Sequence, residues 1–357
     1  MVPEMPEIRV ALVGVGNCAS ALVQGVYKYT DINNSPIGLV HPNLGGYTPK
    51  DIRFVAAFDV DERKVGKDLS EAIFAEPNTT PKFQEVPYIG VEVLRGPLLD
   101  GVGGPLAELV KVSDEPECNV VDVLRRSGAE VVVNLLPSGA MQASRWYAEA
   151  SLKAGCAFIN ATPAPIVNDP HMAGQYRKMG LPLVGDDLMD QVGATVIHRA
   201  LLDFLVRRGV RVLETYQLDV GGGAEALETL TRAKDAKREV KTAAVKSALP
   251  YAAPVVAGST DYVKFLGNRR ESYFWIRGLY FGETELSLDI KLRTVDGPNA
   301  GSVLLDAIRC AKIALDRGIG GPLVSISAYA FKNPPERAPL ELAEKWLEAF
   351  LRGERDS

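Results

Sequence analysis

Lysines and aspartates are the residues of this chain that could do proton-transfer chemistry, because histidine is scarce. The 357 residues include three histidines, and His198 lies in an apolar helical run, where we expect it to be packed rather than catalytic. The composition therefore gives little support to a Ser-His-Asp triad or to a zinc site built from histidines.

Three aspartates fall within five residues of the segment GDDLMDQVGAT, directly after the apolar run LPLV. Carboxylates packed around a strand end cost free energy unless something there needs negative charge or a proton acceptor. We therefore expect Asp186, Asp187 and Asp190 to face a ligand.

Three lysines stand at positions that suggest a shared site. Lys237 and Lys241 are four residues apart in an expected helix and so share one face, which could seat a phosphate or an oxyanion or could be a solvated basic face. Lys332 precedes a proline pair at the end of an apolar run, where it would be held rigidly.

Composition and charge exclude several classes of protein. A net charge of −5 and a pI near 5.5 argue against nucleic-acid binding. Four cysteines without CxxC spacing favour a reducing compartment, with Cys156 and Cys310 as core thiols. The first residues lack the pattern of a signal peptide and no apolar run approaches 18 residues, so we expect a cytoplasmic protein without a membrane partner.

The first expected element is the strand IRVALV, which runs into GVGNCASALVQGVYKY. Gly14, Gly16 and Ala19 stand at the G-x-G-x-x-G/A spacing, with helical periodicity after them. This context predicts a dinucleotide-binding turn, because glycines let the backbone approach a pyrophosphate at a helix N-terminus. The alternative is a tight strand–helix turn without a ligand.

A second strand, IRFVAAFD, follows an expected polar excursion over about residues 29–50. Asp59 at its end is our candidate for the adenosine ribose, and its carboxylate would favour NAD over NADP by repelling a 2′-phosphate. We interpret Asp61 as a helix cap.

Apolar strands within 129–139, 156–165 and 181–187 alternate with helices, which predicts a doubly wound parallel sheet covered on both faces. Ligands bind such sheets beyond the carboxyl ends of the strands. The loops at 137–138, 160–163 and 186–191 should therefore line one cleft with the glycine turn, and the aspartates should face the nicotinamide end. After about residue 198 the alternating pattern favours a second domain with an antiparallel sheet, and the final helices could pack back on the first domain.

At this point the chain resembles the inositol-phosphate synthase family, in its shorter bacterial and archaeal branch. The matching stretches are VALVGVGNCASALVQGV, FVAAFDVDERKVG, GDD…QVGAT…HR, QLDVGG, DGPNAG and DAIRCAKIALDRGIGGP, from about residue 8 to 335. The resemblance implies an α/β fold: a Rossmann-type domain (1–198 and 296–357) with an inserted α+β domain (199–295) that carries catalytic lysines and helps build a homotetramer.

The resemblance also implies a redox-neutral isomerisation of glucose 6-phosphate with bound NAD, by oxidation, enolisation, an intramolecular aldol step and reduction. Cations near developing oxyanions suit such a route. A cation near the nicotinamide is a further implied partner, although its identity stays unknown.

Residue roles carry over position by position. The catalytic set would be Lys237, Lys241, Lys332, Arg270 and Asp187. The cofactor set would be Gly14, Gly16, Asn17, Cys18, Ala19, Asp59, Pro137, Thr162, Asp187 and Asp296. The substrate set would be Asp190, Gln191, Gly223 and Glu225.

Departures from the family pattern gather around the substrate phosphate. Met189 and Asp190 replace a lysine and a phosphate-binding serine, Gly223 replaces an asparagine, Glu225 replaces an aspartate, and Arg270 replaces a lysine. Arginine keeps the charge but cannot easily release a proton. Because most members of such a family keep the ancestral chemistry, glucose 6-phosphate still stands first as substrate. The alternatives are the same cycle on fructose 6-phosphate giving a five-membered cyclitol, a non-catalytic NAD-binding relative, and an ordinary dehydrogenase.

Overall fold

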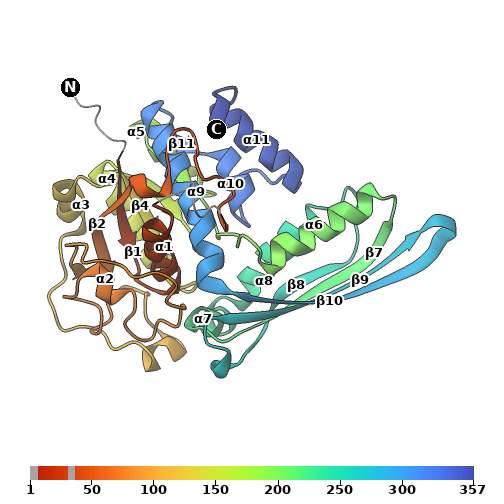
Figure 1. Ribbon diagram of the computed structural model, residues 1–357, viewed down its shortest axis with the longest axis horizontal. Coiled ribbons are helices and arrows are strands. Elements are labelled where there is room, and N and C mark those ends of the chain that lie inside the picture. The colour runs from red at the N-terminus through yellow and green to blue at the C-terminus, as the bar shows by residue number, and fades with distance from the viewer. Residues whose placement is uncertain (1–6, 31–36) are drawn as a thin grey trace.

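The computed structural model describes residues 7–30 and 37–357 (Figure 1). The description leaves out residues 1–6 and 31–36. The expectation of no signal sequence at the start, and part of the expected polar excursion, therefore lie outside the described residues.

A parallel sheet forms the larger half of the molecule, in the order β11-β6-β5-β4-β1-β2-β3. Its strands are β1 (Ile8–Val13), β2 (Ile52–Asp59), β3 (Val93–Arg95), β4 (Val131–Asn134), β5 (Ala157–Asn160), β6 (Pro182–Val184) and β11 (Gly321–Pro322). The strand order reverses between β1 and β4, and ligands bind such folds at this switch point. The predicted Rossmann-type fold is confirmed.

Helices cover both faces of this sheet, which explains why β4 and β5 are buried at every position and β1 at all positions but one. One core joins the sheet to α1 (Asn17–Lys28), α9 (Asp296–Asp316), α10 (Val324–Ala330) and α11 (Leu340–Arg352). The other joins it to α3 (Val120–Ser127), α4 (Met141–Ala154) and α5 (Pro170–Met179). The short α2 (Leu69–Ala72) follows β2. The last helices do pack back on the first sheet, as predicted.

A second sheet, in the order β10-β9-β7-β8, extends to one side (Figure 1). Its strands are β7 (Arg211–Gly221), β8 (Val255–Tyr262), β9 (Arg269–Tyr280) and β10 (Thr284–Val295). The expectation of an antiparallel sheet was wrong in one respect, because β8, which the sequence pattern did not reveal, pairs parallel to β7.

The helices α6 (Ala194–Arg207), α7 (Ala224–Arg232) and α8 (Lys234–Lys246) belong to this half. Leu202 and Leu205 of α6 and Val245 of α8 pack against Val212 and Ile276 of the sheet. His198 is fully buried on α6, as predicted for a packed residue, and contacts Gln217 and Thr215. No helix in the described ranges is both long enough and apolar enough to cross a lipid bilayer.

Candidate active site

The glycine turn leads into the N-terminus of α1, which no side chain of the described residues caps. Gly14 has a φ of 87°, and a Cβ there would lie 2.9 Å from the carbonyl oxygen of Leu135. Gly16 is the N-cap of α1, and a Cβ on it would meet none of the described residues within 4 Å. The open space and the uncapped N–H groups of the helix fit a pyrophosphate.

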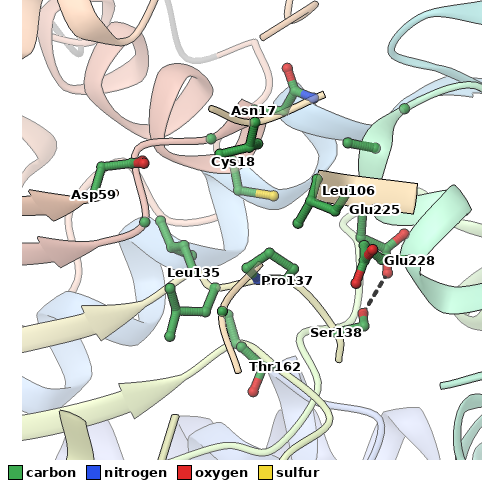
Figure 2. Close-up of a pocket in the computed structure, with 18 of the residues that line it drawn as sticks. Asn17, Cys18, Asp59, Leu106, Leu135, Pro137, Ser138, Thr162, Glu225 and Glu228 are labelled. Atoms are coloured by element: carbon green, nitrogen blue, oxygen red, sulfur yellow. Dashed lines mark hydrogen bonds between the residues drawn. The ribbon is translucent and has the colours of Figure 1, made fainter. Parts of the chain in front are cut away.

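A cavity of about 240 Å³ runs from this turn to the inserted helices (Figure 2). The predicted residues that line it are Gly14, Gly16, Asn17, Cys18, Asp59, Pro137, Thr162, Asp187, Asp190, Gly223, Glu225, Lys237, Arg270, Asp296 and Lys332. Three residues of the catalytic, cofactor and substrate sets do not line it, and neither does Asp186, which is described below. Ala19 is buried inside α1, the Gln191 amide donates to the Gly38 carbonyl, and Lys241 lies behind the lining.

Asp59 reaches the cavity from the end of β2. Its Oδ2 accepts a hydrogen bond from the backbone N–H of Val15 at 2.7 Å, which ties the strand end to the glycine turn. Asp61 is not a helix cap, because no helix follows it. Its carboxylate instead binds the guanidinium of Arg63 in two places, at 2.6 and 2.9 Å.

The segment after β6 pairs with the segment before the proline pair at 334–335. The backbone N–H of Lys332 donates to the carbonyl of Asp187 at 2.7 Å, and the N–H of Met189 donates to the carbonyl of Ala330 at 2.8 Å. This pairing places the side chains of Asp187 and Lys332 in the same wall of the cavity. The Lys332 ammonium donates to the carbonyl of Leu188 at 2.5 Å and is 7% exposed as a residue.

Asp186 does not face the cofactor, contrary to our expectation. It is fully buried, and its oxygens accept from the side chain of Asn160 and from the backbone of residues 166–168. Burial raises the pKa of Asp186 to about 6, against these hydrogen bonds to the charged form. Its role is to hold the loop after β5.

Asp187 lies between two lysines. Its Oδ1 is 3.0 Å from Nζ of Lys237 and 3.7 Å from Nζ of Lys332, and Lys237 also lies 3.2 Å from Glu225. Burial alone would lower the pKa of Lys237, but the carboxylates of Asp187 and Glu225 outweigh it and hold that pKa above its usual value. The alternative of a solvated lysine face is wrong, because Lys237 and Lys241 are 7% and 3% exposed.

Arg270 forms the second charged group of the cavity. It binds Asp296 at 2.8 Å and Glu225 at 3.2 Å, and these acids hold its pKa well above the usual value despite burial. Burial raises the pKa of Asp296 to about 6, against the opposing effect of Arg270. Behind them Lys241 binds Asp219 at 2.7 Å, and burial lowers the pKa of Lys241.

Asp190 differs from the other acids of the cavity. Within the described residues, none of the ion pairs includes Asp190, whereas Asp187, Glu225 and Asp296 each have a cation. Beside it, Met189 is buried and its sulfur lies 3.4 Å from the guanidinium of Arg199. A ligand group that approaches Asp190 should therefore be a hydrogen-bond donor rather than a dianion.

Two further observations limit the chemistry of the cavity. Burial, followed by the carboxylates of Asp190 and Asp296, raises the pKa of Cys18 to about 12, so its thiol stays protonated. Across the residues that the structure describes, no three histidine, cysteine, aspartate or glutamate side chains gather to hold a metal ion.

The sequence pattern missed several residues of the lining. Lys64, Glu228 and Asn268 line the cavity, as does the segment at 97–110. Lys64 could have been suspected, because it follows Asp59 by only five residues and its Nζ lies 3.8 Å from Oδ2 of Asp59. Glu228 is three residues from Glu225 on α7, but nothing local distinguishes it from a surface acid.

Comparison with known proteins gives one consistent result. A family model described as myo-inositol-1-phosphate synthase matches residues 193–297. The chain is 46% identical to an inositol-3-phosphate synthase of Mycolicibacterium smegmatis, over 97% of this chain and 98% of that protein. It is 44% identical to an inositol-3-phosphate synthase of Corynebacterium glutamicum, over 96% and 98%. The crystal structure of Ari2 matches with a TM-score of 0.78 and 33% identity, over 97% of this chain and 99% of that one.

Proposed function

Because the chain belongs to the myo-inositol-1-phosphate synthase family, we propose that it converts glucose 6-phosphate into an inositol phosphate by an NAD-dependent cyclisation without net oxidation. One observation supports this proposal above the others. Lys237, Lys332 and Arg270 converge on a single cavity that is continuous with the glycine turn.

The residues at the turn fit NAD. The N-terminus of α1 would bind the pyrophosphate next to Gly16, and Asp59 would bind the adenosine ribose. Thr162, Pro137 and Asp187 would lie along the nicotinamide half. When bound, NAD accepts a hydride from a secondary alcohol of the sugar and returns a hydride to the ketone of the closed ring.

The lysines would stabilise the oxyanions that develop during enolisation and ring closure. Lys237 and Lys332 suit this role, since Asp187 fixes both ammonium groups and the cavity shields them from bulk water. The raised pKa of Lys237 keeps it protonated and therefore a donor. Lys241, with its lowered pKa, gives up a proton more readily than Lys237.

The test is phosphorus and proton NMR of the purified protein with NAD, with glucose 6-phosphate and fructose 6-phosphate in separate tubes. A six-membered inositol phosphate from glucose 6-phosphate, without accumulation of NADH, is the expected result. Net formation of NADH would instead identify a dehydrogenase. NAD binding without turnover of either sugar would identify a non-catalytic relative.

Fructose 6-phosphate is the second candidate substrate, and Asp190 favours it. A carboxylate without a cation at the substrate end would repel a phosphate placed there, so the sugar could be seated differently from glucose 6-phosphate. A new five-membered cyclic phosphate formed only in the fructose 6-phosphate tube would establish this reaction.

We further propose a homotetramer that acts in the cytoplasm. The outer face of the second sheet supports the assembly, because it leaves Tyr216, Leu218, Val256 and Tyr273 more than a third exposed side by side on β7, β8 and β9. Light scattering after size exclusion tests the tetramer, and a Tyr273→Glu change should disrupt it. The four free thiols support a reducing compartment.

We also propose a cation at the nicotinamide end, which is supported by two carboxylate oxygens. Oδ2 of Asp187 and Oδ1 of Asp296 are buried without a hydrogen-bond partner among residues 7–30 and 37–357, and hard cations bind such oxygens. Two oxygens are fewer than a divalent ion takes, so we derive no catalytic step from it. Activity after treatment with a chelator, with potassium or sodium restored, tests this part of the proposal.

A further inference from the structure

A segment of the first domain crosses the cofactor end of the cavity. This strap, residues 97–110, begins and ends beside β2: the N–H of Gly96 donates to the carbonyl of Asp59, and the N–H of Glu62 donates to the carbonyl of Lys111. Between these anchors it lines the cavity with Leu98, Val102, Leu106 and Val110. The middle of the strap packs against α7 of the second half, and Figure 2 shows Leu106 beside Glu225 and Glu228 of that helix.

Arg232, at the end of α7, fastens the middle of the strap. Its Nη2 donates to the carbonyls of Asp100 and Gly139, at 2.7 and 3.0 Å, and its Nη1 donates to Glu228 at 3.0 Å. The Asp100 carboxylate in turn accepts from the backbone of residues 142 and 143, at the start of α4. One guanidinium therefore joins the strap, the loop before α4 and the second domain.

The slot around Arg232 is lined by glycines. A Cβ on Gly139 would lie 2.8 Å from Nε of Arg232, and a Cβ on Gly103 or Gly104 would lie 3.5 or 3.7 Å from the same side chain. Glu228, which is fully buried, holds the guanidinium from the helix side through Oε2. The backbone of Leu106 approaches this carboxylate, yet no described residue gives Oε1 a partner of ordinary hydrogen-bond geometry. The fit is specific for a planar fork with several donors, which lysine cannot reproduce.

We propose that Arg232 is a positioning residue that latches the strap over the bound cofactor, so that NADH stays in the cavity between the oxidation and the reduction. This inference rests on the proposed function, because only a reaction that returns its hydride needs such retention. The helix that carries the latch also carries Glu225, which contacts Lys237 and Arg270. Closure of the strap and assembly of the lysine cluster would then occur together.

The chemistry of a failed latch is defined. Oxidation moves a hydride from one secondary alcohol carbon to NAD and releases the hydroxyl proton, which leaves a ketone. If NADH departs before reduction, one NADH, one proton and one uncyclised or unreduced ketone appear for each cycle lost. A merely structural residue would lower the amount of active enzyme without changing this ratio.

The experiment measures two quantities in the full-length protein. The first is the dissociation rate of NADH from loaded enzyme, followed by fluorescence after dilution into excess NAD. The second is the ratio of NADH formed to cyclitol phosphate formed with glucose 6-phosphate. Arg232→Ala should raise the dissociation rate about ten-fold or more, equivalent to about 1.4 kcal/mol, and should release NADH where the unmodified enzyme releases none. Arg232→Lys should give a dissociation rate between those of the unmodified enzyme and Arg232→Ala.

Two variants serve as companion and control. Gly139→Ala should reproduce the effect of Arg232→Ala without changing a charge, because the new methyl group displaces the guanidinium. Lys234→Ala removes an exposed cation two residues from the latch and should change neither quantity. Unchanged NADH dissociation in both Arg232→Ala and Gly139→Ala would overturn the latch, as would an equal increase in Lys234→Ala.

The outcomes separate this inference from the proposed function. If the unmodified enzyme forms cyclitol and the variants lose NADH no faster than it does, the proposed function stands and the latch is wrong. If the variants release NADH faster but the unmodified enzyme forms no cyclitol, the latch stands and the proposed function is wrong. An unmodified protein that does not bind NADH overturns both.

Discussion

Oδ1 of Asp187 lies 3.0 Å from Nζ of Lys237, and both groups are almost completely buried. The pair joins the loop after β6 of the first sheet to α8 of the second half. It fixes an ammonium group in a cavity where such a charge would otherwise be costly, and the other carboxylate oxygen of Asp187 has no hydrogen-bond partner in the described part of the chain.

Removing this carboxylate should shift the pH dependence of the reaction. In Asp187→Asn, Lys237 loses the acid that does most to stabilise its charge, so its pKa falls toward the value that burial favours. The amine then loses its proton at lower pH, and the basic limb of the kcat profile should move to lower pH. Profiles over the alkaline range check this. If kcat falls but the basic limb stays at the same pH, then Lys237 does not determine the position of that limb.

Lys332→Ala should lower kcat by about 100-fold to 1,000-fold, the usual effect of removing one oxyanion donor. The protein should still fold, since Lys332 lies at the cavity wall rather than in the apolar core. Lys345→Ala is the matched control, because that lysine is exposed on α11 and pairs only with Glu341. Cyclitol formation by NMR provides the rates. Equal activity in the two variants would remove Lys332 from the mechanism.

The two glycines of the turn should respond differently to alanine. Gly14→Ala forces a side chain into positive φ against the Leu135 carbonyl, so the apo protein itself should lose about 1–3 kcal/mol of stability. Gly16→Ala meets open space in the apo protein and should leave its melting temperature unchanged while weakening NAD binding. Thermal unfolding and NAD titration of both variants distinguish these effects. Equal loss of stability in the two would contradict the geometry.

His198 should make folding stability depend on pH. Burial lowers its pKa to about 4, from an ordinary 6.5, and outweighs the opposing effect of its hydrogen bond with Gln217. The unfolded chain therefore binds more protons between these values, and stability is lost as pH falls from 6.5 toward 4. At pH 5 the loss should reach about 2 kcal/mol.

Urea unfolding at neutral pH and at pH 5 measures that loss. His198→Gln should reduce the difference between the two conditions. His171→Gln, at an exposed histidine on α5, should leave it unchanged. A pH effect that survives in His198→Gln would assign it to other groups.

Asp190→Ser should improve the use of glucose 6-phosphate, chiefly through a lower KM. The change removes the one acid of the substrate end that lacks a cation in the described residues, and with it a repulsion of the substrate phosphate. Asp235→Ser, at an exposed position on α8, is the control for a change in net charge. No gain, or a loss, would show that Asp190 does not repel this phosphate.

The first sheet could be predicted because its signals are local. Apolar strands, helical periodicity and the spacing of Gly14 and Gly16 each lie within about 20 residues, and the sheet has the predicted covered faces. The helical spacing of Lys237 and Lys241 likewise predicted a shared face, although only the fold shows that this face is buried.

The errors concern contacts between distant segments. Asp186 resembles its neighbour Asp187 in sequence, but its partners are the backbone of residues 166–168, so it holds a loop and does not line the cavity. The latch at Arg232 depends on the carbonyls of Asp100 and Gly139, which no periodicity around Arg232 reveals. The strand β8 was missed because its parallel pairing with β7 leaves no hairpin signal.

The pairing of the loop after β6 with the segment at 330–333 has a consequence for biosynthesis. Leu188 and Lys332 are 144 residues apart in the sequence, and the ribosome synthesises the inserted half between them. The strand β11 and the helix α9, which complete the first sheet and its core, also leave the ribosome after that insertion. Domains usually fold as they emerge, but here the first sheet must wait, with the edge at β6 uncovered, until α9 and β11 have been made. Chaperone demand during translation should therefore be highest while the second sheet is being made.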